Sequence, residues 1–126
     1  MSKDLLTDAI TIIRNAENAR KTSCKVPKTK LIERVLKVMK DEGYIKDYKI
    51  LDEERKIEVE LAGKINYCKT IKPRLPVKLS EFQKYEERFL PAADFGILIL
   101  TTSRGVMTHK DAIKNKIGGR LLAFVY

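Results

Sequence analysis

ILILTTSRGVMTHKDAIKNKIGGRLLAFVY, residues 97–126, has the clearest structural pattern in the chain. Its first four residues are continuously apolar and lie between Gly96 and a cluster of hydroxyl residues, which is typical of a buried strand. Thr108, with Asp111 three residues later, resembles a capping box that opens a short helix. The glycine pair at 118–119 is expected to end that helix. The closing RLLAFVY supplies a last strand, so this stretch predicts a strand, a loop, a helix and a second strand.

The first half of the chain shows helical and then strand periodicity. Residues 5–17 place apolar side chains every three or four positions, which predicts an amphipathic helix. Thr29 is expected to cap a second helix, which Gly43 ends. Residues 44–51 and 56–62 predict a hairpin, because KIEVELA alternates apolar and charged side chains. One face of this sheet is therefore expected to be buried and the other to face water.

The middle of the chain is less regular. Residues 63–79 contain Pro73 and Pro76, which exclude a regular central strand but permit an edge strand or an extended crossing segment. We interpret this segment as a linker between two modules. The segment 79–96 is ambiguous, because its aromatic residues have helical spacing while a proline limits the length of any helix (Phe82, Tyr85, Phe89 and Pro91).

Composition and charge narrow the class of function. The 126 residues are 44% apolar and 34% charged, which is a globular composition large enough for one core or two small modules. The formal net charge of +9 favours an anionic partner. The positive charge is clustered in residues 20–40, 64–78 and 101–120, whereas residues 80–94 are net acidic.

Neither a membrane nor a metal is expected. The sequence has no apolar run of membrane-spanning length, and its first residues lack a signal-peptide pattern, so we expect a soluble protein that stays in the cell. Cys24 and Cys68 are far apart in the sequence and have only His109 to complete a metal site. We therefore expect free buried thiols and no cofactor.

A hydrolytic enzyme using Ser103 is one alternative function. A serine nucleophile needs a base within hydrogen-bond reach and a group that orients the base. The only histidine, His109, is expected to be a solvated surface residue. The sequence contains no G-x-S-x-G nucleophile elbow and no glycine-rich nucleotide loop. Catalysis is therefore the less favoured reading.

Binding of structured RNA agrees better with the same loop. The small hydroxyl residues could approach a base edge or a sugar closely, Gly105 frees the backbone to follow, and Arg104 adds a charge for phosphate. Structured RNA exposes 2′-hydroxyls and base edges in a shallow minor groove, where small Ser and Thr side chains can form hydrogen bonds. The alternative is a structural turn rich in Ser and Thr because these residues cap helices. The hydroxyl residues concerned are Thr101, Thr102 and Ser103.

A resemblance separates these possibilities. TTSRGVMTHKDA followed by IGGRLLAFV closely resembles the C-terminal signature of the bacterial-type small-subunit ribosomal protein eight family. VPKTKL followed by LKVMKDEGYIKDY is similar to the second helix and following strand of that family. The resemblance covers essentially the whole chain. The N-terminal DLLTDAITIIRNA also resembles the family motif, at Asp4, Asp8, Thr11, Ile13, Arg14, Asn15 and Ala16.

The resemblance implies an α+β fold of two small packed modules. Residues 1–70 would form an αβαββ module, and residues 71–126 a mostly β module with a short helix and the RNA-contact loop. It implies a non-catalytic constituent of the small ribosomal subunit that binds the central domain of small-subunit ribosomal RNA and supports assembly. The implied partners are that RNA and neighbouring small-subunit proteins, with its own messenger RNA as a further candidate. The implied location is the cytoplasm, in the small ribosomal subunit, which the absence of a transit-like pattern in the first residues favours, although an organelle-encoded copy would need no such pattern.

An RNA-binding translational regulator outside the ribosome is the second alternative function, beside the hydrolytic enzyme.

The resemblance also assigns RNA-binding residues. The minor-groove loop would comprise Thr102, Ser103, Arg104 and Gly105, with Thr101 before it. The remaining candidates are Lys28, Thr29, Lys30, Arg14, Asn15, Gly119 and Arg120.

Three positions depart from the family pattern. The junction KPRLPVK lacks the usual glycine, Arg120 stands where the family usually has Glu, and His109 stands where it has Asp. The family also implies a strand over residues 79–86 instead of the helix that their periodicity suggests. We expect the strand there.

Overall fold

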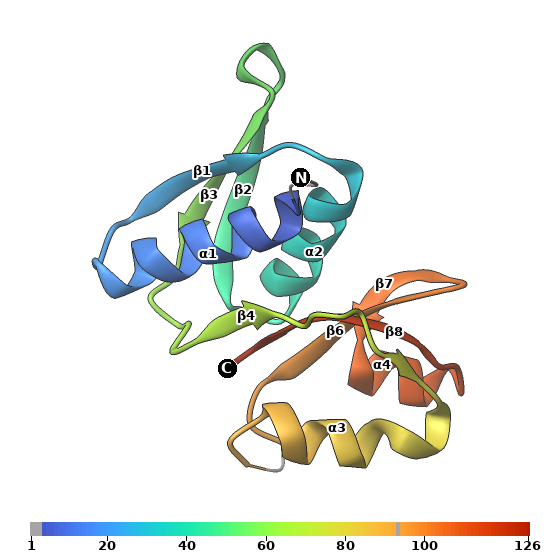
Figure 1. Cartoon of the computed structure of the whole chain (residues 1–126). Coiled ribbons are helices and arrows are strands. Elements are labelled where there is room, and N and C mark those ends of the chain that lie inside the picture. Colours follow the sequence, from blue (N-terminus) through green and yellow to red (C-terminus); the bar gives the residue numbers. More distant parts are fainter. Residues whose placement is uncertain (1–3, 93) are drawn as a thin grey trace. The chain divides into compact units, whose positions relative to one another are not determined.

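The computed structural model describes residues 4–92 and 94–126. The chain divides into two compact units, residues 1–67 and residues 68–126, called here the first and second units (Figure 1). We describe each unit separately.

The first unit packs two helices on one face of a three-stranded antiparallel sheet (Figure 1). The strand order is β1-β3-β2, and β3 alternates exposed and buried residues along its whole length. Because only one face of the sheet is buried, both helices cover that face. In chain order the elements are α1 (Leu5–Asn18), β1 (Ser23–Pro27), α2 (Lys30–Asp41), β2 (Ile45–Leu51), a 3₁₀ turn (Asp52–Glu54) and β3 (Lys56–Leu61).

Local chemistry sets the ends of these helices. The Asp4 carboxylate accepts hydrogen bonds from the backbone N–H groups of Leu6 and Thr7, which caps α1. The Thr29 hydroxyl accepts a hydrogen bond from the Ile32 N–H at 3.0 Å, so the predicted cap of α2 is confirmed. Gly43 follows α2 with a φ of +81°, a conformation that glycine adopts without steric cost.

The second unit is built on a largely buried antiparallel sheet of order β4-β8-β6-β7, with β5 also paired to β8. The apolar residues of β6 and β8 form its core, which confirms the two strands predicted from residues 97–126. Its elements are β4 (Cys68–Thr70), β5 (Pro76–Val77), a 3₁₀ turn (Leu79–Glu81), α3 (Phe82–Phe89), β6 (Ile97–Thr102), β7 (Gly105–Thr108), α4 (His109–Lys114) and β8 (Gly119–Val125).

The expectation of a strand over residues 79–86 was wrong. These residues form the 3₁₀ turn and most of α3, because their aromatic side chains recur at helical spacing and bury Phe82 and Tyr85 on one face. The Glu81 carboxylate accepts a hydrogen bond from the Lys78 N–H at 2.9 Å and fixes the start of the 3₁₀ turn. Periodicity was the better guide here than the family resemblance.

Two further expectations need correction. The segment 63–79 is more than a linker, because β4 and β5 lie in it and both pair with β8. The glycine pair at 118–119 does not end α4, which stops at Lys114. A side chain at Gly118 would overlap the Val77 carbonyl, and one at Gly119 would overlap the Thr101 carbonyl. These glycines therefore allow neighbouring strands to approach β8 closely.

Candidate nucleic-acid interface

The β6–β7 loop is a tight hairpin turn that the hydroxyl group of Thr102 stabilises. Thr102 pairs with Gly105 across the two strands, and Ser103 and Arg104 form the turn. The Thr102 hydroxyl donates to the Gly105 carbonyl at 2.8 Å and accepts from the Arg104 N–H at 3.1 Å. Gly105 has a φ of +109°, where a side chain would be strained. The turn is therefore held in one shape before any ligand binds.

The tip of this hairpin presents one hydroxyl and one guanidinium. Ser103 and Arg104 are both exposed. The Arg104 guanidinium lies 3.4 Å from the Asn115 side-chain oxygen, and the Asn115 amide donates to the Asp111 carbonyl of α4 at 2.8 Å. Sequence reasoning missed Asn115, because no local pattern relates it to a turn eleven residues earlier.

The start of β8 lies against the base of the hairpin. Thr101 is the cross-strand partner of Arg120, and the Thr101 carbonyl occupies the space that a side chain at Gly119 would need. The Arg120 guanidinium lies 3.5 Å from the Arg74 carbonyl in the KPRLPVK junction. The second-unit candidates thus lie together on one surface, called here the hairpin surface, which comprises Thr101, Thr102, Ser103, Arg104, Gly105, Gly119 and Arg120.

The first unit brings together a second group of candidates at the start of α2. Lys28 and Lys30 are exposed on either side of the capping residue Thr29. The Lys28 ammonium forms an ion pair with Asp52, and the Lys28 N–H donates to the Arg55 carbonyl at 3.1 Å. An RNA phosphate would therefore compete with Asp52 for Lys28.

Positive charge continues along α2 beyond the predicted residues. Lys30, Arg34 and Lys37 recur at helical spacing and line a shallow groove of about 220 Å³ with Glu33 and Tyr48. Sequence reasoning identified the basic cluster at 20–40 and singled out Lys30, but it did not single out Arg34 or Lys37. Their three- and four-residue spacing on the polar face of an amphipathic helix was the available signal.

Arg14 and Asn15 lie elsewhere in the first unit, toward the end of α1. Asn15 is exposed. The Arg14 guanidinium carbon lies 5.3 Å from the centre of the Tyr67 ring, which is a cation–π distance. This contact gives Arg14 a packing role inside the first unit.

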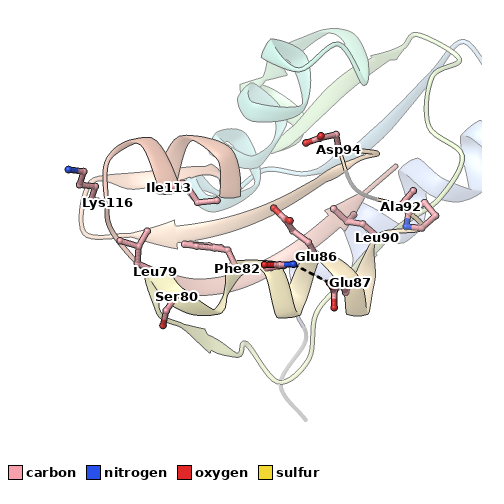
Figure 2. Close-up of a pocket in the computed structure, with 12 residues that line it drawn as sticks. Leu79, Ser80, Phe82, Glu86, Glu87, Leu90, Ala92, Asp94, Ile113 and Lys116 are labelled. Carbon is pink, nitrogen blue, oxygen red and sulfur yellow. Dashed lines mark hydrogen bonds between the residues drawn. The ribbon is translucent and has the colours of Figure 1, made fainter.

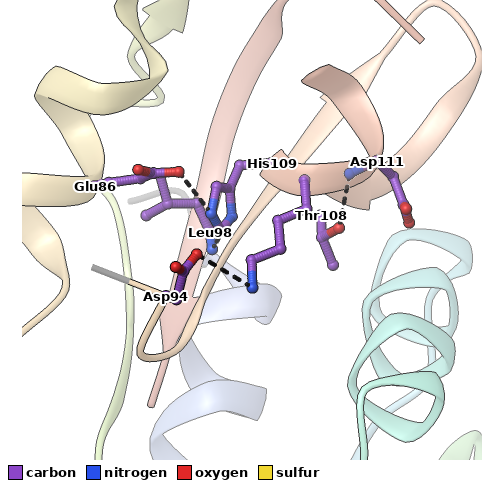
Figure 3. Close-up of polar contacts among 7 residues, drawn as sticks. Glu86, Asp94, Leu98, Thr108, His109 and Asp111 are labelled. Carbon is purple, nitrogen blue, oxygen red and sulfur yellow. Dashed lines mark hydrogen bonds and ion pairs between the residues drawn. The ribbon is translucent and has the colours of Figure 1, made fainter. Parts of the chain in front are cut away.

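The expectation that His109 is a solvated surface residue was wrong. Its side chain is buried, Nδ1 accepts a hydrogen bond from the Leu98 N–H at 3.1 Å, and Nε2 lies 2.9 Å from Glu86 Oε1 (Figure 3). Both ring nitrogens are therefore used inside the second unit and neither is directed to Ser103. His109 is therefore not placed to act as a base for Ser103.

The two cysteines are the other candidate nucleophiles. Neither Cys24 nor Cys68 forms a disulfide in the described part of the chain; Cys68 is buried and Cys24 is half-buried. Burial, and then the charge of Glu17, raise the pKa of the Cys24 thiol to about 11, which disfavours the reactive thiolate. Within residues 4–92 and 94–126, no group of three or more His, Cys, Asp or Glu side chains is placed to hold a metal ion. None of the helices in the same residues is long and apolar enough to cross a membrane.

Comparison with known proteins identifies the family. The model of the family described as Ribosomal protein S8 matches residues 4–126. The chain is 50% identical over 129 residues to the small ribosomal subunit protein uS8 of Archaeoglobus fulgidus, and the alignment covers 100% of each chain. Identity is 50% to the uS8 protein of Picrophilus torridus and 51% to that of Thermoplasma volcanium, again over 100% of both chains. The match extends over both units, and the chain belongs to the ribosomal protein S8 family.

Proposed function

We propose that this protein is a structural constituent of the small ribosomal subunit that binds small-subunit ribosomal RNA directly, in its central domain, and supports assembly of the subunit. Family membership and the names of the full-length relatives support the ribosomal role. The proposed role requires no catalysis, and it is carried out in the cytoplasm, within the small subunit. Its partners are the ribosomal RNA and neighbouring small-subunit proteins.

The hairpin surface is the observation that carries the RNA-binding proposal. Because Thr102 uses its hydroxyl to hold the turn, Ser103 at the tip is the exposed hydroxyl best placed to reach a ligand. Arg104 adds positive charge at the tip of the hairpin, and Arg120 adds it at the base, opposite Thr101. A narrow tip with one hydroxyl and one guanidinium group fits a shallow RNA minor groove, where 2′-hydroxyls and base edges lie beside phosphates.

The two units would make different contributions to RNA binding. Lys28 and Lys30 are long, exposed cations that suit phosphate, which supplies affinity without sequence information. The hairpin surface has a turn held by the Thr102 hydroxyl and short side chains at Thr101, Thr102 and Ser103, which suit recognition of one irregular helix. A segment of the protein's own messenger RNA that folds like the ribosomal site would compete for the same surface.

The test is a ratio of affinities. Ser103→Ala removes a directional hydrogen bond without changing the net charge and leaves its RNA partner unpaired, at a cost of roughly 1 to 3 kcal/mol, or up to about a hundredfold in affinity. Affinity for the central-domain RNA helix is divided by affinity for a regular RNA duplex at one salt concentration. The ratio is expected to fall in Ser103→Ala.

Ser80→Ala is the matched control, because Ser80 is also exposed in the second unit but lies outside the hairpin surface. All three proteins must have the same thermal stability for the comparison to hold. If Ser103→Ala lowers both affinities together, or neither, the loop is a structural turn and recognition lies in the first unit.

A further inference from the structure

The second unit contains a cleft that is separate from the RNA candidates. It has a volume of about 870 Å³ and lies between α3 and α4 (Figure 2). Leu79 and Ile113 line it and are 42% and 43% exposed, so the cleft is open to solvent. Phe82 and Leu90 contribute buried apolar surface. Exposed apolar residues gathered in one groove indicate a binding surface more often than residues scattered singly.

The charged side chains of the cleft have the opposite sign to the protein as a whole. Among the described residues that line it, Glu86, Glu87 and Asp94 are acidic and Lys116 is the one cation, although the formal net charge of the chain is +9. Lys110, which does not line the cleft, lies 3.8 Å from the Asp94 carboxylate. Figure 2 shows Lys116 at the Leu79 end and Asp94 at the opposite end. The Asp94 end of the cleft is therefore an acidic site on a basic protein.

Two of these carboxylates are held in place. Glu86 Oε1 lies 2.9 Å from Nε2 of the buried His109, which itself accepts the Leu98 N–H (Figure 3). The Gln83 side-chain amide donates to Glu87 Oε1 at 3.4 Å, one helical turn away on α3. Carboxylates that are already oriented lose less conformational freedom when they meet a cation.

The acidic side chains of the cleft disfavour RNA as its ligand. Carboxylates repel phosphate, and no residue of the hairpin surface or of the Lys28–Lys30 group lines the cleft. Exposed apolar residues together with acidic side chains instead complement a peptide that carries both apolar and basic side chains. An amphipathic segment laid into a hydrophobic groove is a common mode of peptide recognition.

We propose that the cleft between α3 and α4 docks a basic, amphipathic segment of a protein partner. Its apolar side chains pack against Leu79 and Ile113. Its cations face Glu87 and the exposed Asp94, where they compete with Lys110 for the carboxylate. The cleft thus provides a protein-binding surface in addition to the proposed RNA surfaces, and this inference does not depend on RNA binding.

The probe is a short synthetic peptide with Leu and Lys at helical spacing, labelled with a fluorophore and titrated with the full chain. A Leu–Glu peptide of the same pattern is the charge control. The rest of the protein repels a basic peptide, so binding of the Leu–Lys peptide is itself informative. The unmodified protein is expected to bind the Leu–Lys peptide and not the Leu–Glu peptide, with an affinity that falls as salt rises.

Two cleft variants are compared with two controls. Ile113→Gln removes apolar contact and is expected to weaken Leu–Lys binding by about fivefold. Glu87→Lys reverses an exposed charge and is expected to weaken it by at least about threefold. Leu5→Gln and Glu53→Lys make the same changes at exposed positions of the first unit, where Leu5 is 39% exposed, and should leave binding unchanged.

Three results would overturn the proposal. The first is no binding of the Leu–Lys peptide, or equal binding of the Leu–Glu peptide. The second is equal weakening by the cleft variants and their controls. The third is a loss of affinity for the central-domain RNA helix in Ile113→Gln, which would make the cleft an RNA surface. Failure of the unmodified protein to bind RNA would count against the proposed function and leave the peptide result standing.

Discussion

Replacing His109 with phenylalanine tests how the second unit is held together. The β6–β7 ladder ends at the pair Ile99 and Thr108, so the next pair would be Leu98 and His109. At His109 the backbone turns into α4 and leaves the ladder. The imidazole Nδ1 then accepts the Leu98 N–H in place of a backbone carbonyl (Figure 3). The side chain thus extends the ladder by one hydrogen bond across a strand-to-helix junction.

The magnitude follows from what phenylalanine keeps and what it loses. Its ring is somewhat larger than the imidazole and occupies the same site, so no cavity forms. The Leu98 residue is fully buried, and its N–H loses its acceptor, which costs about 1 to 3 kcal/mol. Glu86 is 29% exposed at its side chain and can turn toward water, so its loss of a partner adds little. We expect His109→Phe to lower the free energy of unfolding by about 2 kcal/mol.

A second variant, Glu86→Gln, tests the charge state of His109. Because Nδ1 accepts a hydrogen bond from a backbone N–H, the proton of the imidazole lies on Nε2 and the ring is neutral. Glu86 then needs only to accept a hydrogen bond, which the side-chain oxygen of glutamine also does. Glu86→Gln is therefore expected to cost less than about 0.5 kcal/mol.

Urea unfolding of the full chain measures both changes, and hydrogen exchange at the Leu98 amide locates them. Exchange at Leu98 is expected to accelerate in His109→Phe and to stay nearly unchanged in Glu86→Gln. The reasoning is refuted if His109→Phe unfolds with the free energy of the unmodified protein. A Glu86→Gln variant as unstable as His109→Phe would show instead that the pair is ionic.

Two further predictions concern the first unit. Lys28→Ala and Lys30→Ala should each weaken binding to specific and non-specific RNA alike. Each should also reduce the slope of log affinity against log salt by about 0.9 for a duplex contact. If a salt titration shows unchanged slopes, these lysines face solvent and do not contact phosphate. Because burial raises the pKa of the Cys24 thiol to about 11, its alkylation rate should increase about tenfold per pH unit up to about pH 11; a rate that levels off near pH 9, as for an ordinary thiol, would contradict this.

Periodicity and capping chemistry predicted most of the fold. Alternation in KIEVELA placed Ile57 and Val59 on the buried face of β3, where they lie. Thr29 and Thr108 cap α2 and α4 as expected, because their hydroxyls accept from N–H groups three residues ahead. Each signal lies within a few residues of its effect, which is why the sequence alone carried it.

Contacts between distant residues could not be predicted in the same way. Because glycine often follows a helix, the pair at 118–119 suggested a helix end. Glycine is instead required there because the carbonyls of Val77 and Thr101 leave no room for a side chain. At the candidate interface, the composition of the hairpin turn was visible in the sequence. The ion pair of Lys28 with Asp52 was not, because it joins residues on either side of α2 and β2.

The correction at residues 79–86 links the fold to the inferred cleft. A strand over residues 79–86 would place alternate residues on opposite faces, so Phe82 and Gln83 could not both face one groove, although both line the cleft. As a helix, the segment buries Phe82 and Tyr85, brings Glu86 to His109, and leaves Glu87 on the wall of the cleft. The acidic cleft and the neutral buried histidine therefore depend on the same helix. Loss of α3 would remove both, whereas the hairpin surface, built on β6, β7 and β8, does not include it.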